Sequence, residues 1–389
     1  MDVTEAGAGK AGEKTRGLTV ADHLLALWKA CRAWVFRGTV LLVGGMACLV
    51  WLTKYHAESN LLTVFVAYLP VWVAALPFLA TLFAGLLFLC WRSTLVSLVM
   101  PVVIILWLGS YSISWGPPAP AAPAAGSFSV MTYNRGQGSD KVLTSFAAQS
   151  QPDVAVFQDA ARRLPRLAAL PQLAGHYHAF QDGEFVLLSR WPLVQNEALQ
   201  LTWTDAASGV CRAGTRSVID WEGRRVVVYN IHLPTPRDLL HWYARRGTFL
   251  YGLLGLVPHT PLHARHQLYL GMWQARVALV SQLVSRVLAE QDPVILLGDL
   301  NLPPAGQGYH ALCGVMQDAH AVAGKGFGHT FPSNMKSMAR LFAPWIRIDH
   351  VFASSGWEVL SSGVSPGGVS QHLPVGAVLR LRESSPNQR

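Results

Sequence analysis

Two long stretches without a charged residue, 61–91 and 93–115, most limit what this chain can fold into. Each is long enough to cross the hydrocarbon core of a bilayer, which takes about 20 apolar residues in a helix. A shorter apolar run, 38–53, precedes them and is close to the minimum length for a span. Pro70 and Pro77 are expected to kink the second run. We therefore predict about three transmembrane helices, or two if the first run lies only at the interface.

The composition agrees with a membrane part joined to a soluble part. Hydrophobic residues make up 51% of the chain, charged residues only 14%, and the mean hydropathy is +0.29. An average soluble domain carries about 25% charged residues. Residues 1–37 are basic, which favours a cytoplasmic start, and Arg92 falls in the other predicted cytoplasmic turn. We therefore expect a multi-pass protein of a bacterial inner membrane, with the part after the third span outside the cytoplasm.

The charge, the start of the chain and the cysteines each leave an alternative open. The net charge of +9 would suit lipid headgroups, phosphoesters or nucleic acid, but membrane topology also requires basic residues. A signal peptide would share the charge and length of the start, yet no small-residue cleavage site follows. No cysteine spacing is typical of a metal finger, and Cys211 and Cys313 form either a disulfide or two separate thiols.

An uncharged Pro/Ala stretch at 116–127 marks a domain boundary. Such a sequence cannot pack and tends to be extended, so it is typical of a semi-rigid spacer. The predicted parts are a basic cytoplasmic N-terminus at 1–37, a membrane domain at 38–115, this linker, a soluble domain at 128–381 and a polar tail at 382–389.

The soluble part contains short apolar runs that are typical of buried strands. In the clearest of them, Val294–Leu297, consecutive aliphatic residues indicate a strand that is buried on both faces. This run ends in Gly298 and Asp299, with Asn301 close behind, and two prolines then prevent its continuation. Further strands are predicted at 127–133, 153–157, 184–189, 217–221, 225–231, 347–352 and 375–381, and helices at 142–149 and 274–290.

Five predicted strand ends carry polar, ionisable or amide side chains. Each has an ordinary structural explanation, such as a turn former, a helix N-cap or a satisfied core histidine. Strands with aligned ends would gather all five at one edge of the sheets, and this coincidence favours a functional site. The residues are Asn134, Asp159, His232 with Asn230, Asp299 with Asn301, and His372.

The order of these motifs resembles that of the endonuclease/exonuclease/phosphatase superfamily, which includes deoxyribonuclease I. The resemblance covers about residues 128–381 and implies a four-layer α/β sandwich, in which two mostly antiparallel sheets lie face to face with helices outside. Spans before such a domain resemble the VanJ-type membrane-anchored phosphatases. The motifs are Tyr133-Asn134, Phe157-Gln158-Asp159, Asn230-Ile231-His232-Leu233, Gly298-Asp299-Leu300-Asn301, Arg347-Ile348-Asp349-His350 and Ser370-Gln371-His372-Leu373-Pro374-Val375.

The resemblance implies a phosphoester hydrolase with a metal site, and this sequence departs from the family at two positions of that site. Asp159 stands where the family has glutamate, with Asn134 beside it, and Gln371 replaces the aspartate that usually precedes the final histidine. A single carboxylate can suffice for Mg²⁺, which keeps several waters. Because the aspartate arm is shorter and the amide is neutral, we expect a working enzyme with a loosely held Mg²⁺ or Mn²⁺.

The resemblance also assigns catalytic roles to the other motif residues. His372 is the expected general base or phosphate-charge partner, and Asp349 would fix its tautomer. Asp299 and Asn301 would position the attacking water and the phosphoryl oxygens, and His232 would donate to phosphate. Arg216 and Arg347 are further candidates for phosphate contacts, although arginines in such places more often have structural roles.

A long apolar excursion, 235–272, follows the strand that carries His232. Its large apolar residues are rimmed by arginines and histidines, which fits a segment in the membrane interface; a helical pair packed on the surface of the domain is an equal alternative. We therefore expect a lipid-linked phosphate or diphosphate as the substrate, such as a polyprenyl carrier lipid. The alternatives are a membrane-tethered nuclease, which would need an exposed basic and aromatic groove, and an inactive binding module.

Overall fold

The computed structural model describes residues 19–109, 113–115, 126–136, 152–171, 173, 178–203, 209–236, 239–240, 248–333, 341, 343–365 and 370–382. The chain divides into two compact units, one formed by 1–45 with 75–102 and the other by 46–74 with 103–389. The first contains helices only, and the second contains the sheets and the predicted site.

Among the described residues, one helix is long and apolar enough to cross a membrane. It is α1 (Val20–His56), together with the short 3₁₀ turn η1 (Ala57–Ser59) that follows it. A second candidate exists only if α2 (Leu61–Tyr68) and the segment Val71–Leu87, bent by 113°, count as one span. Length and composition thus suggest an N-terminal membrane anchor, and the count of three spans stays a prediction.

The second apolar run does not form a single continuous helix. It forms α2, the 3₁₀ helix η2 (Val71–Ala75) and α3 (Leu76–Leu87). The break falls before Pro70, where Leu69 is extended with φ −76° and ψ 151°. A residue before proline avoids the helical conformation because its backbone would clash with the proline ring. The kink expected at Pro70 is therefore a sharp turn.

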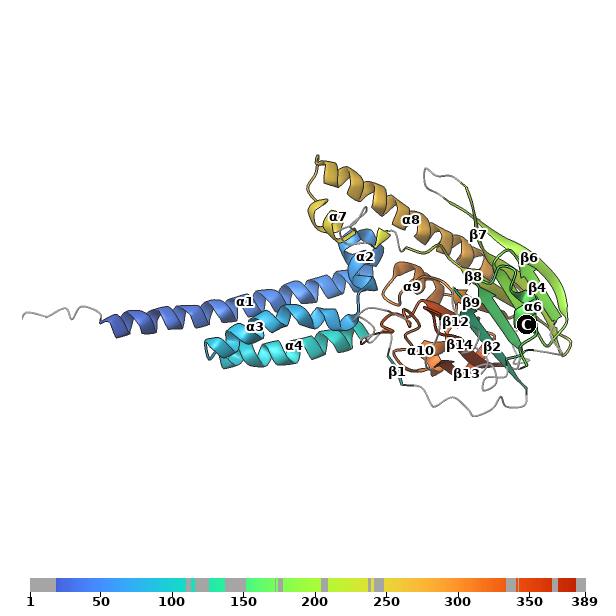
Figure 1. Cartoon of the computed structure of the whole chain (residues 1–389), viewed down its shortest axis with the longest axis horizontal. Coiled ribbons are helices and arrows are strands. Elements are labelled where there is room, and N and C mark those ends of the chain that lie inside the picture. Colours follow the sequence, from blue (N-terminus) through green and yellow to red (C-terminus); the bar gives the residue numbers. More distant parts are fainter. Residues whose placement is uncertain are drawn as a thin grey trace, which may run out of the picture. The chain divides into compact units, whose positions relative to one another are not determined.

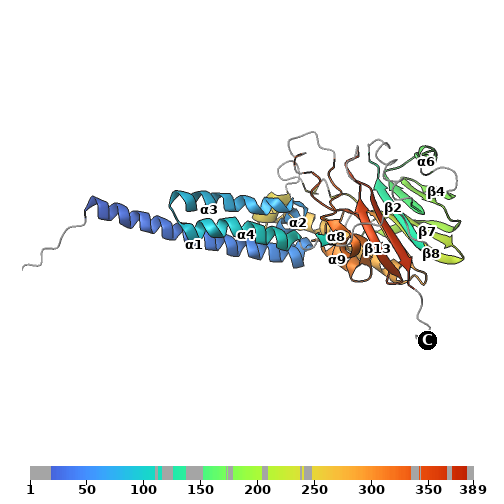
Figure 2. The same cartoon turned by 90° about the horizontal axis from the view of Figure 1, so that it is seen from below.

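In the first unit, hydroxyl groups join helices that are otherwise apolar. Figure 2 shows α3 and α4 (Trp91–Gly109) running alongside α1. The Thr39 hydroxyl hydrogen-bonds the Ser93 hydroxyl, and the Thr81 hydroxyl lies 2.8 Å from that of Ser97. Such bonds between helices satisfy polar groups in surroundings that offer few other partners.

The second unit contains two six-stranded sheets. The strands are β2 (Ser127–Asn134), β3 (Val154–Gln158), β4 (His178–Asp182), β5 (Phe185–Ser189), β6 (Leu193–Thr202), β7 (Val210–Trp221), β8 (Arg224–His232), β9 (Val294–Asp299), β10 (Gln317–Asp318), β12 (Asp349–Ala353), β13 (Trp357–Val364) and β14 (Val375–Leu381). Sheet I has the order β10-β12-β9-β8-β7-β6 and sheet II the order β13-β14-β2-β3-β5-β4. Neighbouring strands are antiparallel, except for the parallel pairs β8 with β9 and β2 with β3.

Alternation along the strands packs these sheets face to face. In β9, Ile295 and Leu297 join an inner core that also contains residues of sheet II, whereas Val294 and Leu296 belong to a separate cluster on the outer face. Because side chains of a strand point alternately to its two faces, Asp299 lies on the same inner face as Leu297. The end of this strand therefore directs its carboxylate toward the opposite sheet.

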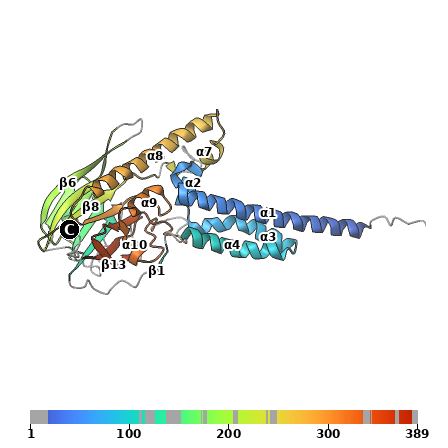
Figure 3. The ribbon, with the colours of Figure 1, turned by 180° about the vertical axis from the view of Figure 1, so that it is seen from behind.

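Helices cover the outer faces of both sheets (Figures 1 and 3). The long helix α8 (Pro261–Leu288) packs Leu279, Val280 and Leu283 on sheet I, next to the short helix α9 (Gln307–Cys313). On sheet II, α6 (Leu164–Ala168) contributes Leu167. The predicted four-layer α/β sandwich is confirmed.

The predicted strands are all present, most with small differences in their ends, but the strand predicted at 217–221 is only the second part of β7, which begins at Val210. The predicted helix at 274–290 is the second part of α8, which begins earlier because Pro261 and the Thr260 cap start it. The strands β4, β6, β10 and β13 and the short helix α10 (Ala319–Ala323) were not predicted. The predicted helix at 142–149 and most of the Pro/Ala linker lie outside the described residues.

The chain that follows α1 packs on the domain within the second unit. Leu61 and Val64 of α2 form a buried cluster with Tyr251 of α7 (Thr248–Leu254) and Trp273 of α8. Figures 1 and 3 show α2 beside α7. Further along, β1 (Ser114–Trp115) pairs with β11 (Lys325–Gly326).

All five cysteines are free thiols. The two that sequence left open as a disulfide or as separate groups, Cys211 and Cys313, are therefore not joined; Cys211 is buried and Cys313 is exposed.

Candidate active site

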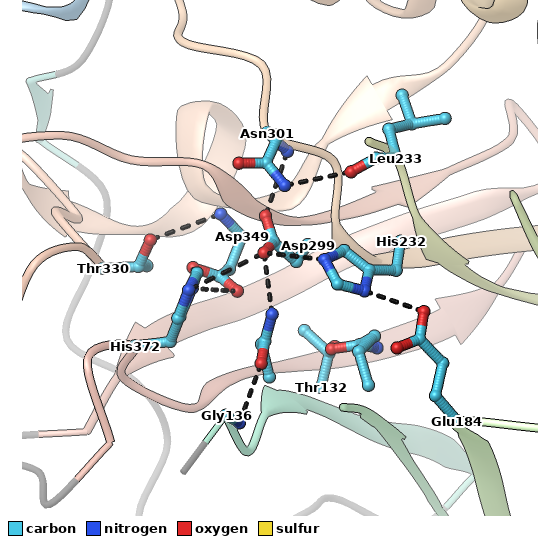
Figure 4. A network of polar contacts seen from close by, with 12 residues as sticks. Thr132, Gly136, Glu184, His232, Leu233, Asp299, Asn301, Thr330, Asp349 and His372 are labelled. Carbon is cyan, nitrogen blue, oxygen red and sulfur yellow. Dashed lines mark hydrogen bonds and ion pairs between the residues drawn. The ribbon is translucent and has the colours of Figure 1, made fainter. Parts of the chain in front are cut away.

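Asp299 lies at the centre of a polar cluster at the ends of both sheets (Figure 4). Its strand neighbours in sheet I place Asp349 on one side and His232 on the other, each directly opposite Asp299 in the register. Gly298 makes this register possible. With a φ of +147°, it lies so close to sheet neighbour β8 that a Cβ would stand 1.9 Å from the Ile231 carbonyl oxygen.

Three polar pairs join the two sheets at this edge, and each takes one partner from each side. Asn134 at the end of β2 donates through Nδ2 to Asp299 Oδ2 at 2.8 Å. His372, just before β14, lies 3.0 Å through Nδ1 from Asp349 Oδ2. The third pair is His232 at the end of β8 and Glu184, between β4 and β5, with 3.1 Å between Nδ1 and Oε1.

The two histidines direct their other ring nitrogens to the same oxygen. His232 Nε2 lies 3.5 Å and His372 Nε2 3.7 Å from Asp299 Oδ2. A carboxylate on Nδ1 fixes the tautomer and the orientation of each ring. The site thus has two carboxylate–imidazole pairs that converge on one central carboxylate.

This arrangement holds both histidines in their charged form. Burial lowers the pKa of His372, but the carboxylates of Asp349 and Asp299 more than offset it and the pKa rises to about 9. Burial likewise opposes the charge on His232, and Glu184 with Asp299 raises its pKa to about 9. At neutral pH the two rings therefore offer positive charge and donors to a phosphoryl group.

The predicted partners Asp349 and Asn301 lie where they support Asp299. Burial raises the pKa of Asp349, against the effect of the His372 charge. Asn301 has a φ of +52°; its backbone N–H donates to Asp299 Oδ1 at 3.0 Å and its side chain donates to the Leu233 carbonyl at 3.0 Å. Asn301 thereby orders the chain around the central carboxylate.

Sequence reasoning gave Glu184 no role in the site. It appeared only as the first residue of a predicted strand, and its contact with His232 depends on the pairing of β5 with β3, which local sequence does not reveal. The β3–β5 pairing also brings Glu184 next to Asp159, which follows β3. One signal was available: Glu184 is an acidic residue directly before an apolar run, and Asp159 follows another such run after only one residue, Gln158.

A second missed group is a buried amide network behind the site. Gln158 Nε2 donates to Asn230 Oδ1 at 2.7 Å, and Asn230 in turn donates to the carbonyls of Phe157 and Val186. Both amides are fully buried and connect sheet I to sheet II. Asn230, named above as a polar strand end, is therefore a structural link. Ser370 adds another, since its hydroxyl donates to the Asn134 carbonyl and accepts from the His372 N–H.

The carboxylates beside His232 fit a divalent cation. One oxygen of Asp159, one of Glu184 and a ring nitrogen of His232 all lie within 4.8 Å of one another. Burial raises the pKa of Asp159 and the neighbouring Glu184 adds to the effect, although the His232 charge opposes it. Two carboxylates that crowd one partly exposed space bind a cation readily, and one or two carboxylates beside several waters are typical of a Mg²⁺ site. Glu184 thus supplies a carboxylate that can replace the one that is absent at Gln371.

The structure places the other predicted metal residues differently. Asn134 is committed to Asp299 through Nδ2 and accepts from the Gly136 N–H through Oδ1. Gln371 is exposed and its carbonyl accepts from Ser333. Their roles as metal ligands stay predictions. A further triad of ligand atoms, from Asp299, Asp349 and His372, lies in the buried half of the cluster.

The two predicted phosphate-binding arginines are not brought to the cluster. Arg216 lies on the outer face of sheet I, where Nη2 donates to Glu290 Oε2 at 2.8 Å beside the Tyr229 hydroxyl. Arg347 is 2% exposed and pairs with Asp318 through Nη1, with a longer bond to the Tyr309 hydroxyl. Each charge is already neutralised by a carboxylate within a structural network, and this is the physical reason that neither is free to bind phosphate.

Solved structures with a similar fold were found in a comparison of coordinates. A protein from Bacteroides thetaiotaomicron, described as an endonuclease/exonuclease/phosphatase family protein, is 17% identical to this chain and has a TM-score of 0.46. The match covers 68% of this chain and 98% of that one. A mannosyl-6-phosphatase from the same organism is 17% identical with a TM-score of 0.44, covering 65% and 99%. A 3′ phosphatase from Neisseria, bound to a product DNA hairpin, is 15% identical with a TM-score of 0.43, covering 66% and 100%.

Sequence comparison identifies the domain. Curated proteins gave no match, so the finer resemblance to VanJ-type phosphatases is not confirmed. The family model described as "Endonuclease/Exonuclease/phosphatase family" matches residues 131–372, more than half of the chain. That match runs from β2 to His372 and includes every residue of the cluster around Asp299. The chain belongs to the endonuclease/exonuclease/phosphatase family.

Proposed function

We propose that the chain is a membrane-anchored, divalent-metal-dependent phosphoesterase that hydrolyses a lipid-linked phosphate or diphosphate. The observation that carries the hydrolytic part is the convergence of His232 Nε2 and His372 Nε2 on Asp299 Oδ2. A phosphoryl group at this point meets two positive donors, and the water that attacks it meets the Asp299 carboxylate. This combination is what transfer of a phosphoryl group to water requires.

The residues of the chain divide the work of the reaction. Asp299 accepts a hydrogen bond from the attacking water and receives its proton, while Asn134 keeps Asp299 Oδ2 in place. One imidazolium donates to the phosphoryl oxygens, and the other gives its proton to the leaving oxygen. The raised pKa values make both rings donors at neutral pH, so His372 acts as a charge partner and acid more readily than as a base.

Asp159 and Glu184 are the residues that would hold Mg²⁺ or Mn²⁺. A divalent cation there would polarise the phosphoryl oxygen and neutralise charge that develops on it. The bond between Glu184 and His232 connects this carboxylate pair to the donor side of the site.

Membrane anchoring and an extracytoplasmic domain complete the proposal. The support is α1, whose apolar length suits an anchor, and the basic N-terminal segment before it. A multi-pass arrangement in a bacterial inner membrane would follow if α3 and α4 also cross the bilayer.

A lipid substrate is supported by the segment that consists of α7 and the turn after it. Its exposed apolar residues, which we call the leucine tip, are Leu250, Leu253, Leu254, Leu256 and Val257, between 42% and 57% exposed. His259 and Arg265 flank the tip, and its other face is anchored by buried Tyr251. An apolar surface with basic neighbours is typical of a segment that lies in the membrane interface.

The leucine tip also lies beside the chain that leaves the anchor helix. A Cβ on Gly252 of α7 would stand 2.5 Å from the backbone nitrogen of Leu62, so α7 and the start of α2 touch at backbone level. Since α2 follows α1 after only the η1 turn, this contact supports a place for the tip near the interface, if α1 is the anchor.

Hydrolysis assays on the full-length protein in detergent micelles test the proposal. We expect phosphate release from phosphatidic acid or a polyprenyl diphosphate with Mg²⁺ or Mn²⁺, and none with a chelator. Cleavage of plasmid DNA alone would favour a tethered nuclease. No metal-dependent activity on any of these would leave a binding module as the better description.

Activity on a lipid substrate and on a soluble substrate can be compared in variants of the leucine tip to test its role. The double variant Leu253→Ser with Leu256→Ser should lower the rate on micellar lipid phosphate but not on soluble p-nitrophenyl phosphate. Leu288→Ser, at a still more exposed site (64%) at the far end of α8, is the control. Equal rates on lipid for both variants would refute the membrane role of the tip.

A further inference from the structure

The carbonyl oxygen of Asn301 accepts hydrogen bonds from two residues that are distant in the sequence. The Tyr68 hydroxyl donates at 2.8 Å and Arg276 Nη2 at 3.2 Å. The φ of +52° at Asn301 is one that few residues other than glycine adopt. Its N–H meanwhile donates to Asp299. Asn301 thus orients the Asp299 carboxylate through its N–H, while Tyr68 and Arg276 hold Asn301 itself through its carbonyl group.

Tyr68 is fixed by its own segment. It is the last residue of α2, which begins at a cap where the Asn60 side chain accepts from the Leu62 N–H at 2.7 Å. The helix stops there because Leu69 precedes a proline. The Tyr68 ring packs on Trp273 of α8, with 5.5 Å between ring centroids. The hydroxyl thus has a defined position above the site loop.

A second contact ties the same segment to the far end of that loop. Glu58 Oε2 accepts from the Gln307 N–H at 2.6 Å, and the Gln307 side chain donates to the Ser59 hydroxyl at 3.3 Å. The preceding Gly306 permits the approach, since a Cβ there would lie 2.7 Å from Glu58 Oε1. Residues 58–68 therefore contact both ends of the chain from 301 to 307.

We propose that Tyr68 is a positioning residue for the active site, and that residues 57–68, directly after the anchor helix, form part of the support of the Asp299–Asn301 loop. The membrane-proximal segment then acts on hydrolysis through Asn301, without touching the substrate. This inference goes beyond the proposed function. Its kinetic consequence rests on that function, whereas its effect on the loop does not.

The alternative is that Tyr68 only adds stability, as any partly buried tyrosine does. Tyr251 provides the matched control, because it belongs to the buried cluster on which Tyr68 packs and its hydroxyl also hydrogen-bonds an arginine, accepting from Arg265 Nη1 at 2.8 Å. That partner leads away from the site. Tyr68→Phe and Tyr251→Phe each remove one hydroxyl together with its hydrogen bonds, so their melting temperatures should fall by similar small amounts.

Amide hydrogen exchange on the full-length protein in detergent micelles measures the loop directly. The amides of Leu300 and Asn301, which donate to the Ile348 carbonyl and Asp299, report on it. We expect their exchange to be about fivefold faster in Tyr68→Phe, as the loss of one ordinary hydrogen bond would give, and unchanged in Tyr251→Phe. Equal exchange in both variants would overturn the inference.

Kinetics with p-nitrophenyl phosphate and Mg²⁺ supply the second readout. Tyr68→Phe should lower kcat about fivefold with little change in KM, while Tyr251→Phe keeps both values. A rise in KM alone would contradict a positioning role, because the substrate is not touched. If the wild-type protein hydrolyses no phosphoester, the proposed function fails and the exchange experiment still decides the role of Tyr68.

Discussion

Asp349 and His350 are consecutive residues of β12, yet they belong to two polar clusters with opposite properties. Asp349 faces sheet II and holds His372 in a cluster that raises the histidine pKa to about 9. His350 faces the other way, where burial and the Arg347 charge lower its pKa to about 3. One strand thus separates a charged imidazole from a neutral one.

The difference lies in how each cluster balances its charges. In the outer cluster Arg347 and Asp318 neutralise each other, and neutral His350 accepts from Arg347 and lies 2.8 Å from the Leu302 carbonyl. The two charges are paired and both side chains are only 1–2% exposed, although Arg347 Nε has no hydrogen-bond partner. In the inner cluster several carboxylates surround two imidazoles, and Glu184 remains 36% exposed. The outer cluster, whose charges are paired and buried, stabilises the fold. The inner cluster is partly exposed to solvent, so its charged groups can still bind a charged ligand.

Neutralising the central carboxylate should have the largest effect on activity. Asp299→Asn keeps the shape of the site but can no longer take a proton or hold two imidazolium groups, so kcat should fall by about 10³-fold. The melting temperature should change little. Metal-dependent phosphate release measures the loss. Asp292→Asn, which removes a surface carboxylate paired with Arg225, is the control and should keep full activity.

Breaking the outer cluster should instead affect stability. Asp318→Asn leaves Arg347 buried without its counter-charge, at a cost of about 3–5 kcal/mol in the free energy of unfolding. Urea unfolding measures it, and the folded fraction should keep its kcat. A large loss of kcat without a loss of stability would mean that the two clusters are not separate.

A variant of Glu184 tests whether the inner cluster binds the cation. Glu184→Gln removes one of the two carboxylates assigned to the cation, so the Mg²⁺ concentration for half-maximal activity should rise about 10–100-fold. Titration of activity with Mg²⁺ tests this. Glu197→Gln, which removes an exposed partner of Arg216, should leave the titration unchanged. The same curve for both variants would exclude Glu184 from the metal site.

The contribution of the outer cluster to the free energy of unfolding should also depend weakly on pH in acid. Burial raises the pKa of Asp318, but the charge of Arg347 outweighs it and the pKa falls from 3.8 to about 2. A depressed carboxyl pKa contributes stability that is present above pH 3.8 and is lost as the pH falls through about 2. This contribution is about 2 kcal/mol. The difference in the free energy of unfolding between the wild type and Asp318→Asn should therefore shrink as the pH falls from 3.8 to about 2, and should be largest above pH 3.8. Unfolding curves at a series of pH values measure it.

Much of the fold and of the site follows from local sequence. Apolar runs located the central strands, and polar residues at their ends located Asp299, His232, Asn134 and His372. Alternation explains why: in β9 and β8 the residues that end the strand have the parity of the inner face. The same rule excludes Arg216, which shares the outer face with Val218 and Tyr229.

What local sequence did not reveal depends on pairing between distant segments. Glu184 reaches His232 only because β5 lies beside β3 and the two sheets stack. Arg347 lies two residues before β12, where alternation gives no direction, and its partner Asp318 is reached only through the pairing of β10 with β12. The contact of Tyr68 with Asn301 joins residues from either end of the chain.

The three pairs that cross between the sheets make the site depend on the docking of one sheet on the other. A chain whose sheets had each formed but had not yet docked would carry every reactive group and no working centre. Newly made protein at that stage would therefore leave the phosphoesters around it intact. Hydrolysis would begin only when the last interface of the domain has closed, and its onset would report that closure.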